Sequence, residues 1–198
     1  MKKPPLLFIF LLIGLNLYSQ TIPMERDGFL DYFISRNSKL CFGDFSEAIQ
    51  DYSEVYFGRS IAKADLNDYQ KAIEDYSKAI ELNPKDSEAY FNRGNAKANL
   101  NDYQGAIQDF SKAIELNPKD SDAYLNRGAV KFDLNDYSGA IQDYNKAIEL
   151  NPDYSDAYFN RGVAKIQLDD KNGACLDWHK AYELGDSDAY DLINTYCK

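Results

Sequence analysis

Residues 87–120 read SEAYFNRGNAKANLNDYQGAIQDFSKAIELNPKD, and residues 121–154 read SDAYLNRGAVKFDLNDYSGAIQDYNKAIELNPDY. The two segments align without a gap and are identical at 23 of 34 positions. The prolines near the ends of successive segments, Pro84, Pro118 and Pro152, stand 34 residues apart. A fixed period of this length indicates a repeat architecture, in which each unit packs on its neighbours to complete a shared core.

Each repeat has the apolar spacing of two α-helices. In residues 103–116 the apolar side chains recur at intervals of three and four, which is one face of a helix. Asp102 is a natural N-cap for this helix. Pro118 ends it, because proline disfavours helical geometry in the residue before it. The sequence therefore predicts helix–turn–helix units and an all-α fold.

The recurring positions resemble those of the tetratricopeptide-repeat (TPR) family. The first helix has a small residue at Ser60, Gly94, Gly128 and Gly162. The second helix has an alanine, then an aromatic residue, then another alanine, as in Ala72, Tyr76, Ala79; Ala106, Phe110, Ala113; Ala140, Tyr144, Ala147; and Ala174, Trp178, Ala181. The resemblance covers roughly residues 29–198. It implies an α–α superhelix, a TPR solenoid, of about five repeats with a C-terminal capping helix.

The repeat period divides the chain into eight segments. We expect a signal peptide at 1–19, a linker at 20–28, a truncated first repeat at 29–53, repeats two to four at 54–86, 87–120 and 121–154, a degenerate fifth repeat at 155–186, and a capping helix at 187–198. At the C-terminal end, Asp186 replaces the proline. The segment after it suits a capping helix, because terminal repeats need a polar outer face.

The N-terminal segment is typical of a secretory signal peptide. Lys2 and Lys3 precede an apolar run from Leu6 to Leu17. This run is shorter than the roughly 20 apolar residues that a membrane-spanning helix needs. We expect cleavage near Ser19, export to the periplasm or the exterior, and no stable membrane insertion afterwards.

The junction between the first two repeats lacks ten residues. A regular junction carries ten further residues, KAIELNPKDS at 78–87 and 112–121, whereas here Ser53 is followed directly by Glu54. The apolar spacing continues across the junction. We therefore predict one fused helix from about Phe45 to Leu66, with a tight break near Gly58 as the rival arrangement. A fused helix would leave apolar surface uncovered, which suggests a homodimer.

Composition argues against several classes of function. A net charge of −10 argues against nucleic acid as a partner, because phosphate contact needs clustered basic residues. The three cysteines form no C-x-x-C pair, and His179 is the only histidine. The chain contains no glycine-rich phosphate loop and no nucleophile motif. We expect no enzymatic activity, no cofactor and no metal.

Basic residues recur in the first helices at positions that, in the resembled family, face the second helix. They are Arg93 and Lys97, Arg127 and Lys131, and Arg161 and Lys165. An unpaired charge there would be costly. We expect pairing with the aspartates one step before each second-helix aromatic residue: Asp75, Asp109, Asp143 and Asp177. A site for an anionic ligand is the alternative.

The resemblance places the first helices on a concave surface, and asparagine recurs there as Asn92, Asn126 and Asn160. A side-chain amide can pair with a peptide backbone of any sequence, because it both donates and accepts hydrogen bonds. The predicted groove also includes Phe91, Asn95, Leu125, Phe132, Phe159 and Ile166. Such a row suits an extended or helical peptide. The alternative is that asparagine is merely tolerated at these positions.

Family geometry also brings Cys175 and Cys197 together, because consecutive helices run antiparallel. Export would allow a disulfide between them, and the alternative is two buried thiols. Cys41 would remain unpaired.

The leading interpretation is a non-catalytic scaffold that holds a peptide or protein partner in the cell envelope or outside the cell. The alternative is a structural or self-assembling envelope protein that oligomerises through its irregular N-terminal repeat.

Overall fold

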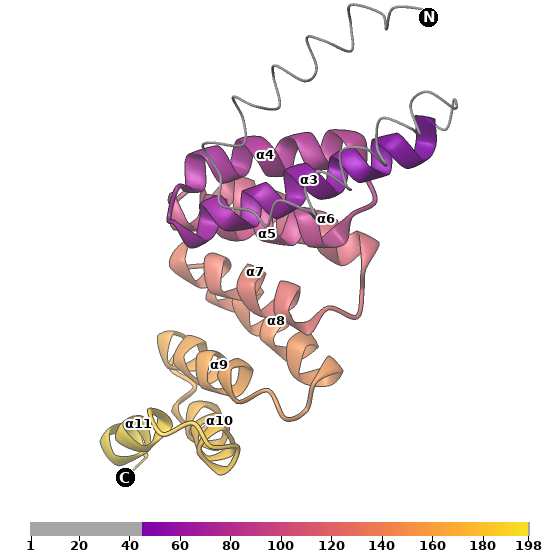
Figure 1. Ribbon diagram of the computed structural model, residues 1–198. Helices are drawn as coiled ribbons and strands as arrows, with labels where there is room; N and C mark the ends of the chain where they lie inside the picture. Colours follow the sequence, from indigo (N-terminus) through magenta and orange to yellow (C-terminus); the bar gives the residue numbers. More distant parts are fainter. Residues whose placement is uncertain (1–44, 198) are drawn as a thin grey trace, which may run out of the picture. The chain divides into compact units, whose positions relative to one another are not determined.

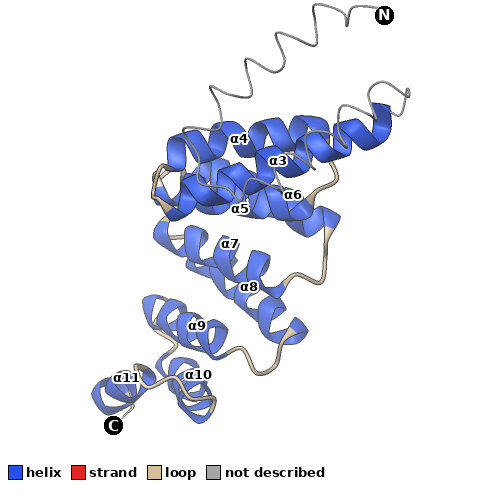
Figure 2. Ribbon diagram, in the orientation of Figure 1, coloured by secondary structure: helices blue, strands red, loops and turns tan. Residues whose placement is uncertain are grey.

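The computed structural model describes residues 45–197, which form helices joined by turns (Figures 1 and 2). The helices are α3 (Phe45–Asp65), α4 (Tyr69–Leu82), α5 (Ser87–Asn99), α6 (Tyr103–Leu116), α7 (Ser121–Asp133), α8 (Tyr137–Leu150), α9 (Ser155–Gln167), α10 (Lys171–Glu183) and α11 (Ala189–Tyr196). No strand occurs among these residues, so the all-α prediction is confirmed. The expected signal peptide, linker, first helix of repeat one and Cys41 lie outside the described residues.

Residues from Tyr52 onward form one compact unit, and the description below concerns this unit. Within a repeat, α5 packs on α6, α7 on α8 and α9 on α10. Between repeats, each second helix packs on the first helix that follows it: α4 on α5, α6 on α7 and α8 on α9. The first helices also contact one another, α5 with α7 and α7 with α9. The first helices therefore share one side of the stack, which we call the inner face.

The turns within repeats depend on short polar side chains. Asn67, Asn101, Asn135 and Asp169 adopt left-handed backbone angles, with φ between 59 and 62°, a conformation that asparagine and aspartate tolerate. The residue that follows each of them precedes the second helix. Asp102 shows the capping: its side chain accepts a hydrogen bond from the backbone N–H of Gly105 at 3.0 Å.

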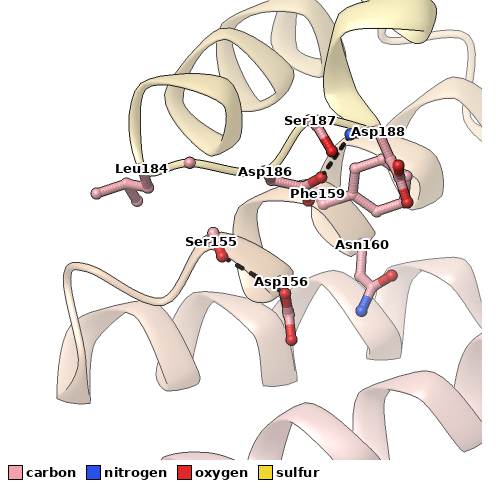
Figure 3. Close-up of a pocket in the computed structure, with 9 residues that line it drawn as sticks. Ser155, Asp156, Phe159, Asn160, Leu184, Asp186, Ser187 and Asp188 are labelled. Carbon is pink, nitrogen blue, oxygen red and sulfur yellow. Dashed lines mark hydrogen bonds between the residues drawn. The ribbon is translucent and has the colours of Figure 1, made fainter.

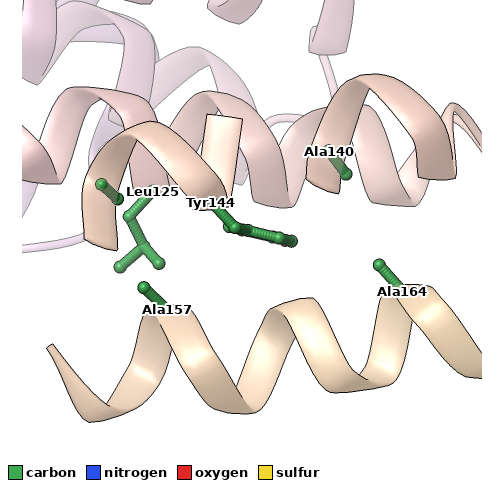
Figure 4. Packing of buried hydrophobic residues seen from close by; sticks show 6 residues of the cluster. Leu125, Ala140, Tyr144, Ala157 and Ala164 are labelled. Carbon is green, nitrogen blue, oxygen red and sulfur yellow. The ribbon is translucent and has the colours of Figure 1, made fainter. Parts of the chain in front are cut away.

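The core alternates alanines with one large aromatic residue per repeat. Tyr144 is 2 % exposed and lies among Leu125, Ala140, Ala157 and Ala164 (Figure 4). These alanines are fully buried. A methyl group is all that fits, because the aromatic ring fills the space between neighbouring helices.

The helix α3 crosses the junction of the first two repeats without a break. It runs through Gly58 to Asp65, so the predicted fused helix is confirmed and the rival break near Gly58 is excluded. Its second half belongs to the repeat stack: Ser53 is 2 % exposed and donates a hydrogen bond to the carbonyl of Ala79 at 3.0 Å. Phe57 packs edge-on against Tyr76 at 5.9 Å between ring centroids.

A disulfide bond joins Cys175 on α10 to Cys197 at the end of α11. The two Cα atoms are 5.7 Å apart, within the range that a disulfide spans. The bond closes a loop with a sequence separation of 22. It holds α11 against α10, where Ala189, Leu192 and Ile193 pack on the cluster around Trp178.

The glycines of the first helices predict opposite effects of the same substitution. A Cβ atom added at Gly128 would lie 2.7 Å from the ring of Tyr144, whereas one added at Gly58 would have no neighbour within 4 Å. We expect Gly128→Ala to lower the free energy of unfolding by about 1–3 kcal/mol through overpacking. Gly58→Ala should raise it by about 1 kcal/mol through helix propensity. Urea unfolding of both variants checks this; destabilisation by both would contradict the fold.

The disulfide predicts a stability that depends on reductant. Constraining the unfolded chain with a loop of this length contributes about 3 kcal/mol in the chain-entropy model. Reduction should therefore lower the unfolding midpoint of the native chain. The variant with Cys175→Ser and Cys197→Ser should unfold at the lower midpoint with or without reductant. If the unfolding midpoint of the native chain is the same with and without reductant, the result would argue against the disulfide bond.

Candidate functional site

The predicted asparagines lie on three first helices, Asn92 on α5, Asn126 on α7 and Asn160 on α9, and all three are half-buried. The side-chain amide of Asn126 donates a hydrogen bond to the side-chain oxygen of Asn95 at 3.1 Å. This bond links α7 to α5 across the inner face. In the described part of the chain, the side chains of Asn92 and Asn160 form no hydrogen bond. Their amides thus remain available to a ligand.

The apolar residues of the predicted groove take part in the core to different extents. Phe91 lies against Phe110, at 5.8 Å between ring centroids, and Phe132 lies against Tyr137 at 5.2 Å. Phe159 and Ile166 pack on the cluster around Trp178. All four keep part of their surface exposed.

Leu125 differs from the other apolar residues of the predicted groove. It is 8 % exposed and packs in the core beside Tyr144 (Figure 4). Its assignment to the groove is therefore corrected: it fills the space between two repeats. Sequence period alone did not distinguish it from Phe91 and Phe159, which occupy the same repeat position.

Two cavities open on the inner face, and Asn160 lines both of them. The smaller, of about 160 Å³, is also lined by Ala129, Phe132, Asp133, Tyr144 and Val163. The larger, of about 450 Å³, lies between the start of α9 and the turn from α10 to α11. Its lining is Ser155, Asp156, Phe159, Asn160, Leu184, Gly185, Asp186, Ser187 and Asp188 (Figure 3).

Residues 184–188 form one wall of the larger cavity, and the sequence did not predict their role there. The available signal was Asp186, which stands where the preceding repeats have proline. This departure indicates a different turn after α10.

The predicted ion pairs form behind the inner face, between first and second helices. Arg93 donates two hydrogen bonds to the carboxylate of Asp109, at 2.9 and 2.7 Å, and Lys97 contacts it at 2.7 Å. The same three-residue set, which we call the Arg–Asp–Lys triad, recurs as Arg59, Asp75, Lys63; Arg127, Asp143, Lys131; and Arg161, Asp177, Lys165. The four aspartates are 3–4 % exposed.

Three of the four triad arginines also contact the repeat before their own. Arg93 donates to the hydroxyl of Ser77 at 3.0 Å, Arg127 donates to Ser111 at 3.0 Å, and Arg161 donates to the side-chain oxygen of Asn145 at 2.6 Å. The guanidinium groups lie over tyrosine rings one turn earlier, as Arg93 lies over Tyr90 at 5.5 Å. The four arginines are therefore paired with buried aspartates inside the scaffold. This arrangement favours the predicted structural ion pairs over the alternative of an anion site.

The described residues give no sign of metal chemistry. They contain no group of three or more His, Cys, Asp or Glu side chains placed to hold a metal ion. His179 is exposed on α10. Within the described residues, no helix combines the length and apolar character needed to cross a membrane.

Comparisons with known proteins agree with the geometry. Family models described as TPR repeat match residues 62–101 and 130–169, and models described as Tetratricopeptide repeat match residues 87–120 and 110–142. Among curated proteins, none is significantly similar in sequence.

Solved structures with a similar fold include MamA, at 27 % identity and a TM-score of 0.67, covering 85 % of this chain and 99 % of that one. The Arabidopsis OM64 TPR domain is 30 % identical with a TM-score of 0.59, covering 60 % of this chain and 98 % of that one. The first TPR of Spaghetti (RPAP3), bound to the HSP90 peptide SRMEEVD, is 26 % identical with a TM-score of 0.59, covering 61 % and 95 %.

The first triad predicts acid sensitivity. Burial tends to raise the pKa of Asp75, but hydrogen bonds from Arg59 and Lys63 outweigh it and hold the pKa below its ordinary value. A lowered native pKa means that the unfolded chain binds more protons. The contribution to stability is therefore present above about pH 4 and is lost as the pH falls through the native pKa.

We expect the free energy of unfolding to fall between about pH 5 and pH 2, with a shallower slope in Asp75→Asn than in the native chain. Urea unfolding across this range measures both slopes. Equal slopes in the two proteins would contradict the role assigned to Asp75.

Proposed function

We propose that this chain, which belongs to the tetratricopeptide-repeat family, is a non-catalytic scaffold that holds a peptide or protein partner on its inner face. The observation that carries the proposal is Asn160. Its half-buried amide forms no hydrogen bond within the described chain, and it stands between two open cavities. An extended peptide could pair its backbone with this amide and place side chains in the cavities on either side.

The bonded pair Asn126 and Asn95 extends the same surface toward α5. Asn126 uses one N–H for the bond to Asn95, so it keeps a second N–H and its carbonyl oxygen. Asn95 keeps both of its donors. The RPAP3 domain, which has a similar fold, binds an HSP90 peptide. This similarity supports peptide binding as the use of the inner face here.

We further propose that the chain is exported to the periplasm or the exterior. Two observations support this: the basic and apolar start of the sequence, which is typical of a signal peptide, and the disulfide between Cys175 and Cys197. Disulfides persist in oxidising compartments and are rare in the cytosol.

Self-assembly is the second candidate function, and one observation favours it. On α3 and just after it, the apolar side chains of Val55, Ile61 and Leu66 are 37, 36 and 80 % exposed. Apolar surface of this kind can pair with a second copy. A pull-down from envelope extract separates the candidates: a heterologous partner supports the scaffold, whereas self-association alone supports assembly.

The amide row predicts a specific loss of binding. Peptides selected from a displayed random library against the native chain should bind the double variant Asn126→Ala, Asn160→Ala more weakly. The expected loss is about 1–3 kcal/mol for each amide that pairs with the peptide. Titration calorimetry measures the affinity, and circular dichroism should show unchanged helicity.

The matched control removes two exposed asparagines from α10 and α11, as Asn172→Ala and Asn194→Ala. These changes should leave the affinity as it is. Equal affinity of all three proteins for the selected peptides would rule out the inner face as the binding surface.

A further inference from the structure

The larger cavity has an uncompensated negative charge. Its lining includes the carboxylates of Asp156, Asp186 and Asp188, and it contains no lysine, arginine or histidine. Its volume of about 450 Å³ lies within the range of sites that bind small ligands or side chains. Figure 3 shows Asp156 and Asn160 together on α9, with Asp186 and Asp188 on the segment that leads into α11.

None of these carboxylates takes part in an ion pair within the described part of the chain. Asp186 accepts one hydrogen bond from the backbone N–H of Asp188 at 2.9 Å. Asp156 accepts a long one, 3.4 Å, from the hydroxyl of Ser155. A carboxylate can accept about four hydrogen bonds, so most of their hydrogen-bonding capacity is not used within the described part of the chain.

The nearby cations cannot balance this charge, because they are committed elsewhere. Arg161 and Lys165 of α9 are 17 and 20 % exposed, and both are held by Asp177 at 2.6 and 2.7 Å. The inner side of α9 is therefore acidic although the helix carries two basic residues.

Helix N-termini offset only part of the charge. Asp156 lies in the first turn of α9 and Asp188 directly precedes α11, and carboxylates are favoured at such positions by the helix dipole. Each dipole supplies roughly half a positive charge, so two of them leave about two of the three negative charges. Asp186 lies outside any helix, and no dipole accounts for it.

The rest of the lining fits the stem of a long basic side chain. Phe159 and Leu184 provide apolar wall, and Asn160 provides a hydrogen-bonding group at the edge. Lysine and arginine bury their methylene stems against apolar surface while the charged end meets carboxylates. An aromatic face such as that of Phe159 adds a cation–π attraction.

The geometry points to a basic, extended peptide segment as the occupant, and this inference rests on the proposed function. Its lysine or arginine side chain enters the larger cavity among Asp156, Asp186 and Asp188. Its backbone crosses Asn160, and an apolar side chain enters the smaller cavity, which Ala129, Phe132 and Val163 line. Asp133 at that cavity favours a second basic residue nearby.

Three synthetic peptides of equal length test the inference. They share the same apolar residues at alternate positions and carry lysine, glutamine or glutamate at the others. We expect the lysine peptide to bind the full chain at least about tenfold more tightly than the glutamine peptide, with an affinity that falls as salt is raised. The glutamate peptide should bind most weakly.

Two variants locate the charge. Asp156→Asn with Asp188→Asn should weaken the lysine peptide by about tenfold and leave the glutamine peptide unchanged. Asp191→Asn is the matched control, since it also removes a carboxylate from the first turn of a helix but lies outside the cavity lining. It should have little effect on either peptide.

The inference would be overturned if the three peptides bind equally well, if the glutamate peptide binds most tightly, or if none of them binds. It would also be overturned if the variant with Asp156→Asn and Asp188→Asn binds the lysine peptide as tightly as the native chain does. The proposed function is tested by a separate measurement, the affinity of the double variant Asn126→Ala, Asn160→Ala for library-selected peptides. A failed test of the basic peptide therefore does not by itself overturn peptide binding on the inner face.

Discussion

The fold depends on one buried carboxylate per repeat. Asp75, Asp109, Asp143 and Asp177 are almost inaccessible to solvent, and a charge in that position is tolerated only if it is paired and hydrogen-bonded. The arginine and lysine of the first helix supply both requirements, with two hydrogen bonds from a planar guanidinium and one contact from an ammonium group. Because the third arginine nitrogen reaches the preceding repeat, the same triad fixes both the pairing within a repeat and the register between repeats.

The triads also determine the character of the inner face. They draw the basic residues of the first helices toward the second helices, so the opposite side of each first helix carries amides, apolar side chains and carboxylates. A chain with net charge −10 thus pairs the cations of its triads with buried aspartates inside the scaffold. The acidic cavity at Asp156, Asp186 and Asp188 is a consequence of this separation.

Much of the architecture could be predicted because it repeats. The triads follow from a charge that recurs in phase with a buried aromatic residue, and the continuous helix α3 follows from a missing turn. The role of Leu125 could not be predicted, because it shares its repeat position with Phe91 and Phe159, and only the packing between two particular repeats decides which side chain is covered. The larger cavity was missed for a related reason: residues 184–188 depart from the repeat, and the path of a non-repeating turn is set by the contacts of α11 and by the Cys175–Cys197 bond.

The central claim is that ligands bind on the inner face formed by the first helices. A titration of isotopically labelled protein with a selected peptide, followed by NMR, tests it directly, because asparagine side-chain amides give resolved signals. The account predicts that the largest shifts occur in the side-chain amides of Asn92, Asn126 and Asn160, while exposed second-helix residues such as Gln108 and Gln142 remain unperturbed. Large shifts confined to the second helices, with the three asparagines unchanged, would contradict it.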